Sequence, residues 1–301
     1  MLKNFVSHIQ STKNFQIKGL FYIVIALFFL SCSPTLYVLD NSPNLAGNIY
    51  KKTSVEKIQK ELKENPKDLN KLKTGVEALT TYAFGFLIEE SDRLMLENYT
   101  NAKDLEFEAH QYFVEAVSYG DLAISQTNDD YYKWLNGEGE LKTEINFENQ
   151  DFDLFYWVAA AYGGAISSSG GNPKWIIKLP KVGKLLNSII DINPNWNNGA
   201  ALVAKISFTM NNPLLSPSEA DSISKSLFNA AIDASNGKDM GPYLTYAESV
   251  SKTRQNKEEF ISLLNEALKI KVKSEENFQL TNTISKNRAE WLLNNIDEFF
   301  Y

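Results

Sequence analysis

The chain has little of the two residue types on which most metal sites and many nucleophilic enzymes depend. Its 301 residues include one cysteine and two histidines, Cys32, His8 and His110. A single cysteine leaves no partner for an intramolecular disulfide, and so few His and Cys residues disfavour zinc sites and most bimetallic hydrolases. A Cys–His protease is excluded in the same way if Cys32 is modified. We therefore expect no metal, no cofactor and no enzymatic activity.

A long apolar run is also missing. The main apolar stretch, Leu20–Leu30, has 11 residues, whereas a membrane-spanning helix needs about 20. Before it, Met1–Lys18 contains three lysines and no acidic residue. A basic start, a short apolar centre and a small residue, Ser31, at the cleavage point are typical of a secretory signal. We predict that residues 1–31 are a signal peptide.

The residue after the predicted cleavage point is Cys32, and this arrangement resembles the lipobox of bacterial lipoproteins. In that family the cysteine sulfur carries a diacylglycerol and the new amino terminus is acylated, which implies lasting membrane attachment. Phe29, three residues before the cysteine, departs from the commoner Leu. An ordinary signal peptide that happens to contain a cysteine is the alternative. Residues 32–48, with two prolines, a glycine and several Asn and Ser residues, are predicted to be a flexible tether.

The remaining residues, 49–301, are predicted to form an all-helical domain. Apolar residues recur at three- and four-residue spacings, and no comparable alternation with period two favours a sheet. The clearest stripes are Leu105–Gly120, Leu179–Ile190, Ile223–Ala234, Phe260–Leu268 and a last helix that presents Trp291, Leu292, Ile296, Phe299 and Phe300 on one side.

Helix boundary signals agree with this interpretation. Ser216, Pro217 and Glu219 form the pattern of a capping box at a helix start. The stretch Gly170-Gly171-Asn172-Pro173 predicts a helix end followed by a capped restart. A phosphate-binding loop is excluded there, because the Lys-Ser/Thr that should follow is absent.

Three segments share a weak repeat of the form Leu-[Leu/Phe]-Asn. They are "LLNSIIDINPN" (185–195), "LFNAAIDASNG" (227–237) and "LLNEALKIKVK" (263–273). Each is preceded by another helical segment, so the period is that of tetratricopeptide-like helix pairs, which would form a compact solenoid or bundle. An irregular helical bundle remains the alternative.

Several longer stretches together resemble the T-component lipoproteins of TRAP (tripartite ATP-independent periplasmic) transporters. They are "DLFYWVAAAYGGAISSS" (153–169), "KLPKVGKLLNSIIDINPNWNNGAALV" (178–203), "PYLTYAESVSKTRQNKEEFISLLNEALKI" (242–270) and "NRAEWLLNNIDEFF" (287–300). The chain departs from relatives in the Asn-rich turn Asn195–Asn198 and in the polar segment Thr127–Gln150.

The resemblance implies an all-helical, lipid-anchored, periplasm-facing protein of divergent tetratricopeptide-like pairs. It also implies a partner, the soluble solute receptor of the transporter, and leaves a homo-oligomer open. Ser33 after the cysteine favours the outer membrane. The excess of 37 acidic over 30 basic residues disfavours binding to nucleic acid.

Aromatic side chains are the candidates for a ligand or partner surface, because Tyr and Trp combine apolar bulk with a polar tip. They are Tyr156, Trp157, Tyr162, Trp175 and Trp196. Core packing is the competing interpretation at helical spacing. Glu106 and His110 are close enough on a helix to pair, and Glu89 with Arg93 suggests a solvated face.

We therefore expect a non-enzymatic lipoprotein that partners the solute receptor of a TRAP-type transporter, with a passage for a hydrophobic or organic-acid solute. The alternative is a helical scaffold lipoprotein for envelope protein assembly.

Overall fold

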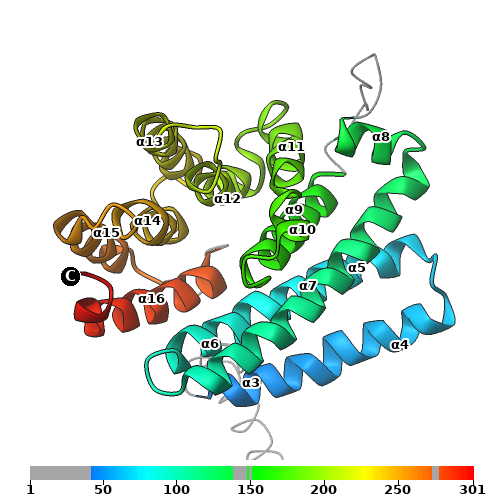
Figure 1. Ribbon diagram of the computed structural model, residues 1–301, viewed down its shortest axis with the longest axis horizontal. Coiled ribbons are helices and arrows are strands. Elements are labelled where there is room, and N and C mark those ends of the chain that lie inside the picture. The colour runs from blue at the N-terminus through cyan, green and yellow to red at the C-terminus, as the bar shows by residue number, and fades with distance from the viewer. Residues whose placement is uncertain (1–41, 138–147, 149–150, 273–277) are drawn as a thin grey trace, which may run out of the picture.

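The computed structural model describes residues 42–137, 148, 151–272 and 278–301, and over these residues the chain is helical and contains no strand (Figure 1). The prediction of an all-helical fold is confirmed. The α-helices are α3 (Pro43–Tyr50), α4 (Glu56–Glu64), α5 (Leu69–Tyr82), α6 (Glu89–Leu94), α7 (Tyr99–Thr127), α8 (Tyr131–Asn136), α9 (Phe152–Ser167), α10 (Pro173–Ile176), α11 (Leu179–Ile190), α12 (Ala200–Met210), α13 (Pro217–Ala234), α14 (Gly241–Tyr246), α15 (Lys257–Lys269) and α16 (Gln279–Asn294).

Short turns of other helix types join several of these elements. Three are π-helical, η1 (Lys51–Val55), η2 (Ala83–Ile88) and η5 (Ala247–Ser251), and two are 3₁₀-helical, η4 (Trp196–Gly199) and η6 (Ile296–Glu298). The predicted signal peptide and Cys32 lie outside the described residues.

The folded part begins earlier than the sequence suggests. Helix α3 starts at Pro43, inside the stretch 32–48 that was predicted to be a flexible tether. Proline suits the first helical position, because its fixed φ is helical and its missing N–H has no partner there. Gly47 is buried, and a Cβ placed on it would lie 3.0 Å from the Phe86 ring. Residues 43–48 therefore belong to the domain.

The predicted apolar stripes face inward on four helices. Phe113 on α7, Leu186 on α11 and Leu264 on α15 are fully buried. On α13 Phe228 and Ala231 are buried, but Ile223 at its start is exposed. The capping box is present as predicted, since the Ser216 side chain accepts from the Glu219 N–H and the Glu219 carboxylate accepts from the Ser216 N–H.

The last helix is shorter than predicted. Helix α16 ends at Asn294, and the Asn295 side-chain amide donates to the carbonyl of Trp291 at 2.8 Å, which competes with a further helical turn. Phe300 follows after η6 and packs edge-on against Phe260, with ring centroids 5.1 Å apart. The final aromatics therefore cover α15 from an irregular segment instead of a helix face.

The three repeat segments occupy the second helix of three consecutive pairs: α9 with α11, α12 with α13, and α14–η5 with α15. In each pair the second residue of the motif is buried and the asparagine that follows is exposed; the buried residues are Leu186, Phe228 and Leu264. The same side chain thus performs the same packing role in each pair.

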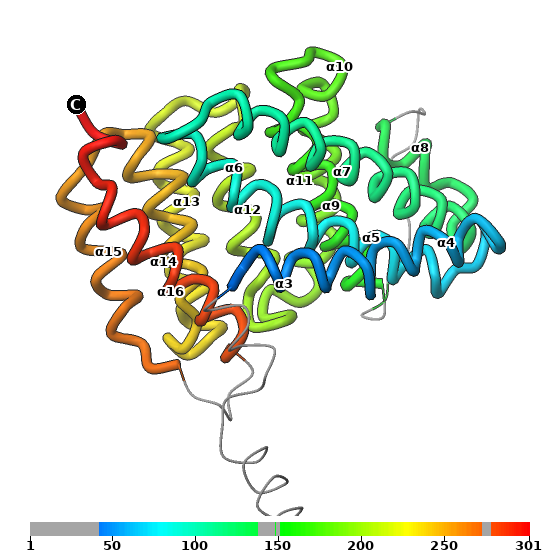
Figure 2. The backbone as a smooth tube through the Cα atoms, turned by 90° about the horizontal axis from the view of Figure 1, so that it is seen from below, coloured from blue at the N-terminus to red at the C-terminus, as the bar shows by residue number. Residues whose placement is uncertain are grey.

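The buried side chains form two cores that meet at α12. One extends from Val55 to Ala201 and the other from Ile206 to Leu292, so a single helix contributes to both. The chain curves, and its last helix α16 returns to lie beside α3 and α6 in both views (Figures 1 and 2).

A glycine allows helices α7 and α9 to approach each other closely. A Cβ on Gly164 would lie about 2.4–2.5 Å from three atoms of the Phe113 ring, closer than van der Waals contact permits. The neighbouring Gly163 has no atom within 4 Å of such a Cβ. Helix α9 therefore contacts α7 through one glycine of the pair.

This difference predicts opposite effects for two adjacent substitutions. Gly164→Ala is expected to lower the free energy of unfolding by about 1–3 kcal/mol through overpacking against Phe113. Gly163→Ala is expected to raise it by about 0.5–1 kcal/mol, because alanine loses less conformational freedom in a helix. Urea denaturation followed by circular dichroism measures both. A shift of the two variants in the same direction would contradict the packing described.

Candidate functional site

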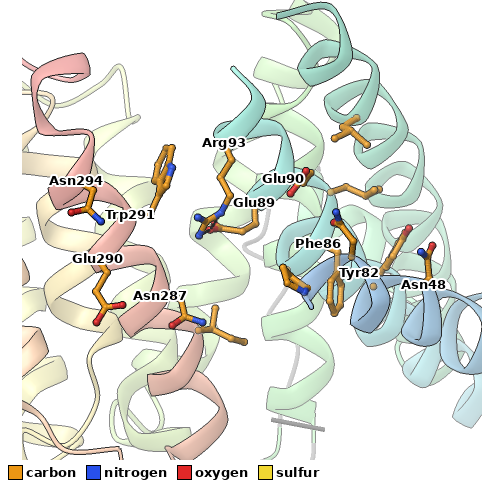
Figure 3. A pocket seen from close by; sticks show the side chains of 17 residues that line it. Asn48, Tyr82, Phe86, Glu89, Glu90, Arg93, Asn287, Glu290, Trp291 and Asn294 are labelled. Atoms are coloured by element: carbon orange, nitrogen blue, oxygen red, sulfur yellow. Dashed lines mark hydrogen bonds and ion pairs between the residues drawn. The ribbon is translucent and has the colours of Figure 1, made fainter. Parts of the chain in front are cut away.

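A cleft of about 810 Å³ lies where the first and last helices of the described chain meet (Figure 3). Its volume is in the range of pockets that bind small molecules. One wall consists of residues from α3, α5, η2, α6 and the start of α7, and the other is α16. The lining residues are Pro43, Asn44, Gly47, Asn48, Tyr82, Gly85, Phe86, Leu87, Glu89, Glu90, Arg93, Leu105, Ile284, Asn287, Glu290, Trp291 and Asn294.

The N-terminal wall is shaped by the π-helical turn η2, which interrupts one long helix between α5 and α6. Such turns widen the helix by one residue and are frequent at functional sites. Phe86 in this turn lies between Tyr50 and Tyr82, with ring centroids 5.7 and 5.9 Å away. Gly85 beside it has open space where a Cβ would be. The result is an aromatic surface with room next to it.

The opposite wall presents Trp291 from α16. The guanidinium carbons of Arg93 and Arg288 lie 5.3 and 4.9 Å from its ring centroid, within cation–π range. Asn287 and Asn294 lie on the same helix and also line the cleft (Figure 3). These two contacts favour the observed orientation of the indole at the point where α16 faces α6.

Arg288 lies beside the cleft and binds Glu89, one of its lining residues. The Arg288 side chain, only 13 % exposed, forms ion pairs with Glu89 at 3.1 Å, Asp92 at 2.8 Å and Glu248 at 2.7 Å. Glu89 and Asp92 are three residues apart on α6, and Glu248 belongs to η5. Burial by itself disfavours the charged guanidinium, but the three carboxylates outweigh it and raise the pKa of Arg288. The salt bridges join α6, η5 and α16.

Local contacts fix the carboxylates that meet Arg288. The buried Ser91 hydroxyl donates to the Ala102 carbonyl at 2.8 Å and so ties α6 to α7. Arg93 pairs with Glu89 at 2.5 Å, so Glu89 accepts from two guanidiniums. Burial raises the pKa of Asp92, against the opposing charge of Arg288.

The lining of the cleft is amphipathic and more acidic than basic. It contains the rings of Tyr82, Phe86 and Trp291, four asparagine amides, and three carboxylates, Glu89, Glu90 and Glu290, against the one cation Arg93. Because Arg93 already pairs with Glu89, the lining offers no uncompensated positive charge to an anion.

The predicted aromatic residues do not line this cleft. Tyr156, Trp157 and Trp196 come together as half-buried neighbours, with centroids 5.4 Å apart for Tyr156–Trp157 and for Tyr156–Trp196. Trp175 lies on α10 and contacts His110 edge-on at 5.5 Å. The Lys178 Nζ lies 3.8 Å from the Trp175 ring centroid and 5.9 Å from that of the buried Tyr162, so the five residues form two groups.

Tyr162 is a core residue. Its hydroxyl donates to the Asp121 carboxylate at 2.6 Å, and Tyr131 donates to the same carboxylate at 2.7 Å. Burial raises the pKa of Asp121, although the two hydrogen bonds favour its charged form. These bonds join α7, α8 and α9.

Two expectations about polar pairs need correction. Glu106 pairs with Lys103 and not with His110, whose Nδ1 lies 3.1 Å from the Ser168 hydroxyl. Glu89 does pair with Arg93, but it faces the cleft and Arg288 instead of solvent alone. The contact between Glu89 and Arg288 was missed. Its signal in the sequence is that Arg288 falls within the apolar pattern of α16, because a buried charge requires a partner of opposite charge.

The described residues hold no group of three or more His, Cys, Asp and Glu side chains suited to a metal ion. Among those same residues, no helix has the length and apolar character needed to cross a membrane.

These features define the class: over its described residues the protein is all-helical, with a cleft of small-molecule size between α3 and α16. The chain belongs to the TRAP transporter T-component family, because the model of that family matches residues 57–300. The resemblance inferred from the sequence is therefore confirmed, and membership makes the chain a component associated with TRAP transport and not a known enzyme. No curated protein matches the chain.

The Arg288 contacts predict a large and pH-dependent loss of stability in Arg288→Met. Three carboxylates would be left close together without a cation, which is expected to cost about 2–4 kcal/mol near neutral pH. Burial raises the pKa of Asp92, and loss of the cation that opposes this shift raises it further, so the variant gains stability as the pH falls through that pKa. Urea denaturation at neutral and mildly acidic pH measures the difference from the wild type, which should shrink on acidification.

Arg254→Met is the matched control. Arg254 pairs with a single carboxylate, Asp221, at 2.9 Å, and both side chains are about one-third exposed or more. Its loss is expected to cost less than about 1 kcal/mol. Two results would show that Arg288 does not hold α6 and α16 together. One is an equal loss of unfolding free energy in both variants, and the other is a loss in Arg288→Met that is the same at both pH values.

Proposed function

We propose that the protein is a non-enzymatic, lipid-anchored component of a TRAP-type transporter that faces the periplasm and partners the solute receptor. The match to the T-component family over residues 57–300 is the observation that carries this proposal. The lipobox-like sequence at Ser31–Cys32 supports the anchor, and Ser33 supports the outer membrane.

The helix pairs support a scaffold of divergent tetratricopeptide-like units. In the three consecutive pairs the equivalent motif residue is buried, as expected when each unit covers its neighbour. Anchoring such a scaffold would raise the local concentration of a bound receptor near the membrane.

The cleft is proposed to bind the transported solute transiently. Its aromatic rings and asparagine amides suit a partly apolar, neutral molecule. An organic acid is disfavoured there, because the lining has three carboxylates and its one cation is already paired. Of the two solute classes that the sequence suggested, the lining supports the hydrophobic one.

Affinity purification of the full-length protein from its native envelope tests the partnership. Gentle, low-salt extraction is expected to recover a soluble TRAP solute receptor together with the membrane fraction. Cys32→Ser should leave the protein folded but release it from that fraction. Failure to recover any solute receptor after chemical crosslinking would overturn the proposed partnership, and membrane retention of Cys32→Ser would overturn the lipid anchor.

Filling the cleft tests its role in solute binding. Gly85→Phe places a ring in the open space beside Phe86 and is expected to weaken binding of the neutral fluorescent probe N-phenylnaphthylamine about tenfold, by occupying the volume the probe needs. Gly163→Phe on α9 is the control, because it adds the same ring in open space outside the cleft. This variant should bind the probe with the affinity of the wild type. Fluorescence titration measures both. Unchanged binding by Gly85→Phe would rule out the cleft as the probe's site.

A further inference from the structure

Helix α10 projects from the body of the protein (Figure 2). Gly170 and Gly171 before it have φ values of 62° and 82°, which favour glycine, and the Asn172 side chain caps its start. Ile176 and Ile177 at its end are 47 % and 77 % exposed. The turn therefore holds two large apolar side chains in water.

Lysines surround these isoleucines. Lys174, Lys178 and Lys181 follow one another at three- or four-residue spacing along α10 and α11. The Lys178 Nζ lies 3.8 Å from the centre of the Trp175 ring, and the Lys181 Nζ lies 5.8 Å from that of Tyr162. The rings position the ammonium groups without neutralising them.

No ion pair joins any of these three lysines to a carboxylate of the described residues, although the chain as a whole is acidic. Asp121 is the carboxylate that acts on Lys178, and it is already engaged by the hydroxyls of Tyr131 and Tyr162. The neighbouring charge of Lys181 and, above all, partial burial lower the pKa of Lys178. Asp121 acts on both Lys178 and Lys181 but lies beyond ion-pair distance, so among the described residues their positive charge is only partly balanced.

The position of this surface favours a soluble protein over a membrane. In Figure 2 α10 projects from the top of the molecule, whereas α3, where the described chain begins, lies in the lower half of the view. A protein anchored through Cys32 would therefore present α10 away from the bilayer.

We propose that Lys174, Ile176, Ile177, Lys178 and Lys181 form a docking surface for an acidic face of a soluble protein partner. Isoleucines give the apolar contact, and the lysines select carboxylates around it and speed association. Under the proposed function, on which this identification of the partner rests, the acidic face belongs to the solute receptor.

Photocrosslinking in the intact envelope tests the surface. A benzoyl-phenylalanine at position 177 of the full-length protein is expected to form an adduct with the solute receptor, identified by mass spectrometry. The same group at Leu214, which is 87 % exposed between α12 and α13, should not form it. The adduct should fall about tenfold in the Lys178→Glu/Lys181→Glu background, since reversed charges repel an acidic partner. Lys57→Glu/Lys60→Glu on α4 makes the same charge change at the same spacing elsewhere and should leave the adduct unchanged.

The outcomes separate this surface from the proposed function. The docking surface is overturned if position 177 forms no adduct, forms an adduct with lipid, or forms a protein adduct whose yield is unchanged by the charge reversal. In each of these cases, a receptor recovered by affinity purification still supports the proposed function. If a charge-sensitive adduct forms with an acidic soluble protein other than a solute receptor, the docking surface stands and the assignment of the receptor as its partner fails.

Discussion

The shape of the molecule depends on one guanidinium that is held among three carboxylates. Arg288 comes from the last helix, Glu89 and Asp92 come from a helix about two hundred residues earlier in the chain, and Glu248 comes from between them. Bringing a charge out of water is costly unless its partners are fixed in place. Here Ser91, Arg93 and the π-helical turns fix them, so α16 rests against α6 through polar contacts instead of a shared apolar core.

This polar closure explains why a cleft exists at all. The two apolar cores are continuous only through α12, and they are separate where α16 meets α3 and α6. An apolar closure would have filled the space between these helices with side chains. Ion pairs beside the cleft hold the walls at a fixed separation and leave the space between them open, lined by rings and amides.

Much of the fold could be predicted from the sequence, because helix periodicity and capping are local properties. The stripes on α7, α11 and α15, the capping box at Ser216 and the restart at Asn172 are present as expected. The family resemblance was also correct. The cleft could not be predicted, since its walls are separated along the chain by nearly the whole domain and no local pattern pairs Glu89 with Arg288. The aromatic run of α9 has no part in this cleft, and there the Tyr162 hydroxyl donates to the Asp121 carboxylate.

The π-helical turns set the orientation of carboxylates that bind Arg288, so the number of residues in each turn matters. Glu89 directly follows η2, and Glu248 lies within η5, so two of the three carboxylates depend on a turn that holds one residue more than an α-helical turn. Loss of a single codon in either segment would convert the turn to regular helix and rotate one flank against the other by about 100°. Genes for this protein should therefore keep the length of these two short segments, even at positions whose side chains make no contact with the cleft or with Arg288.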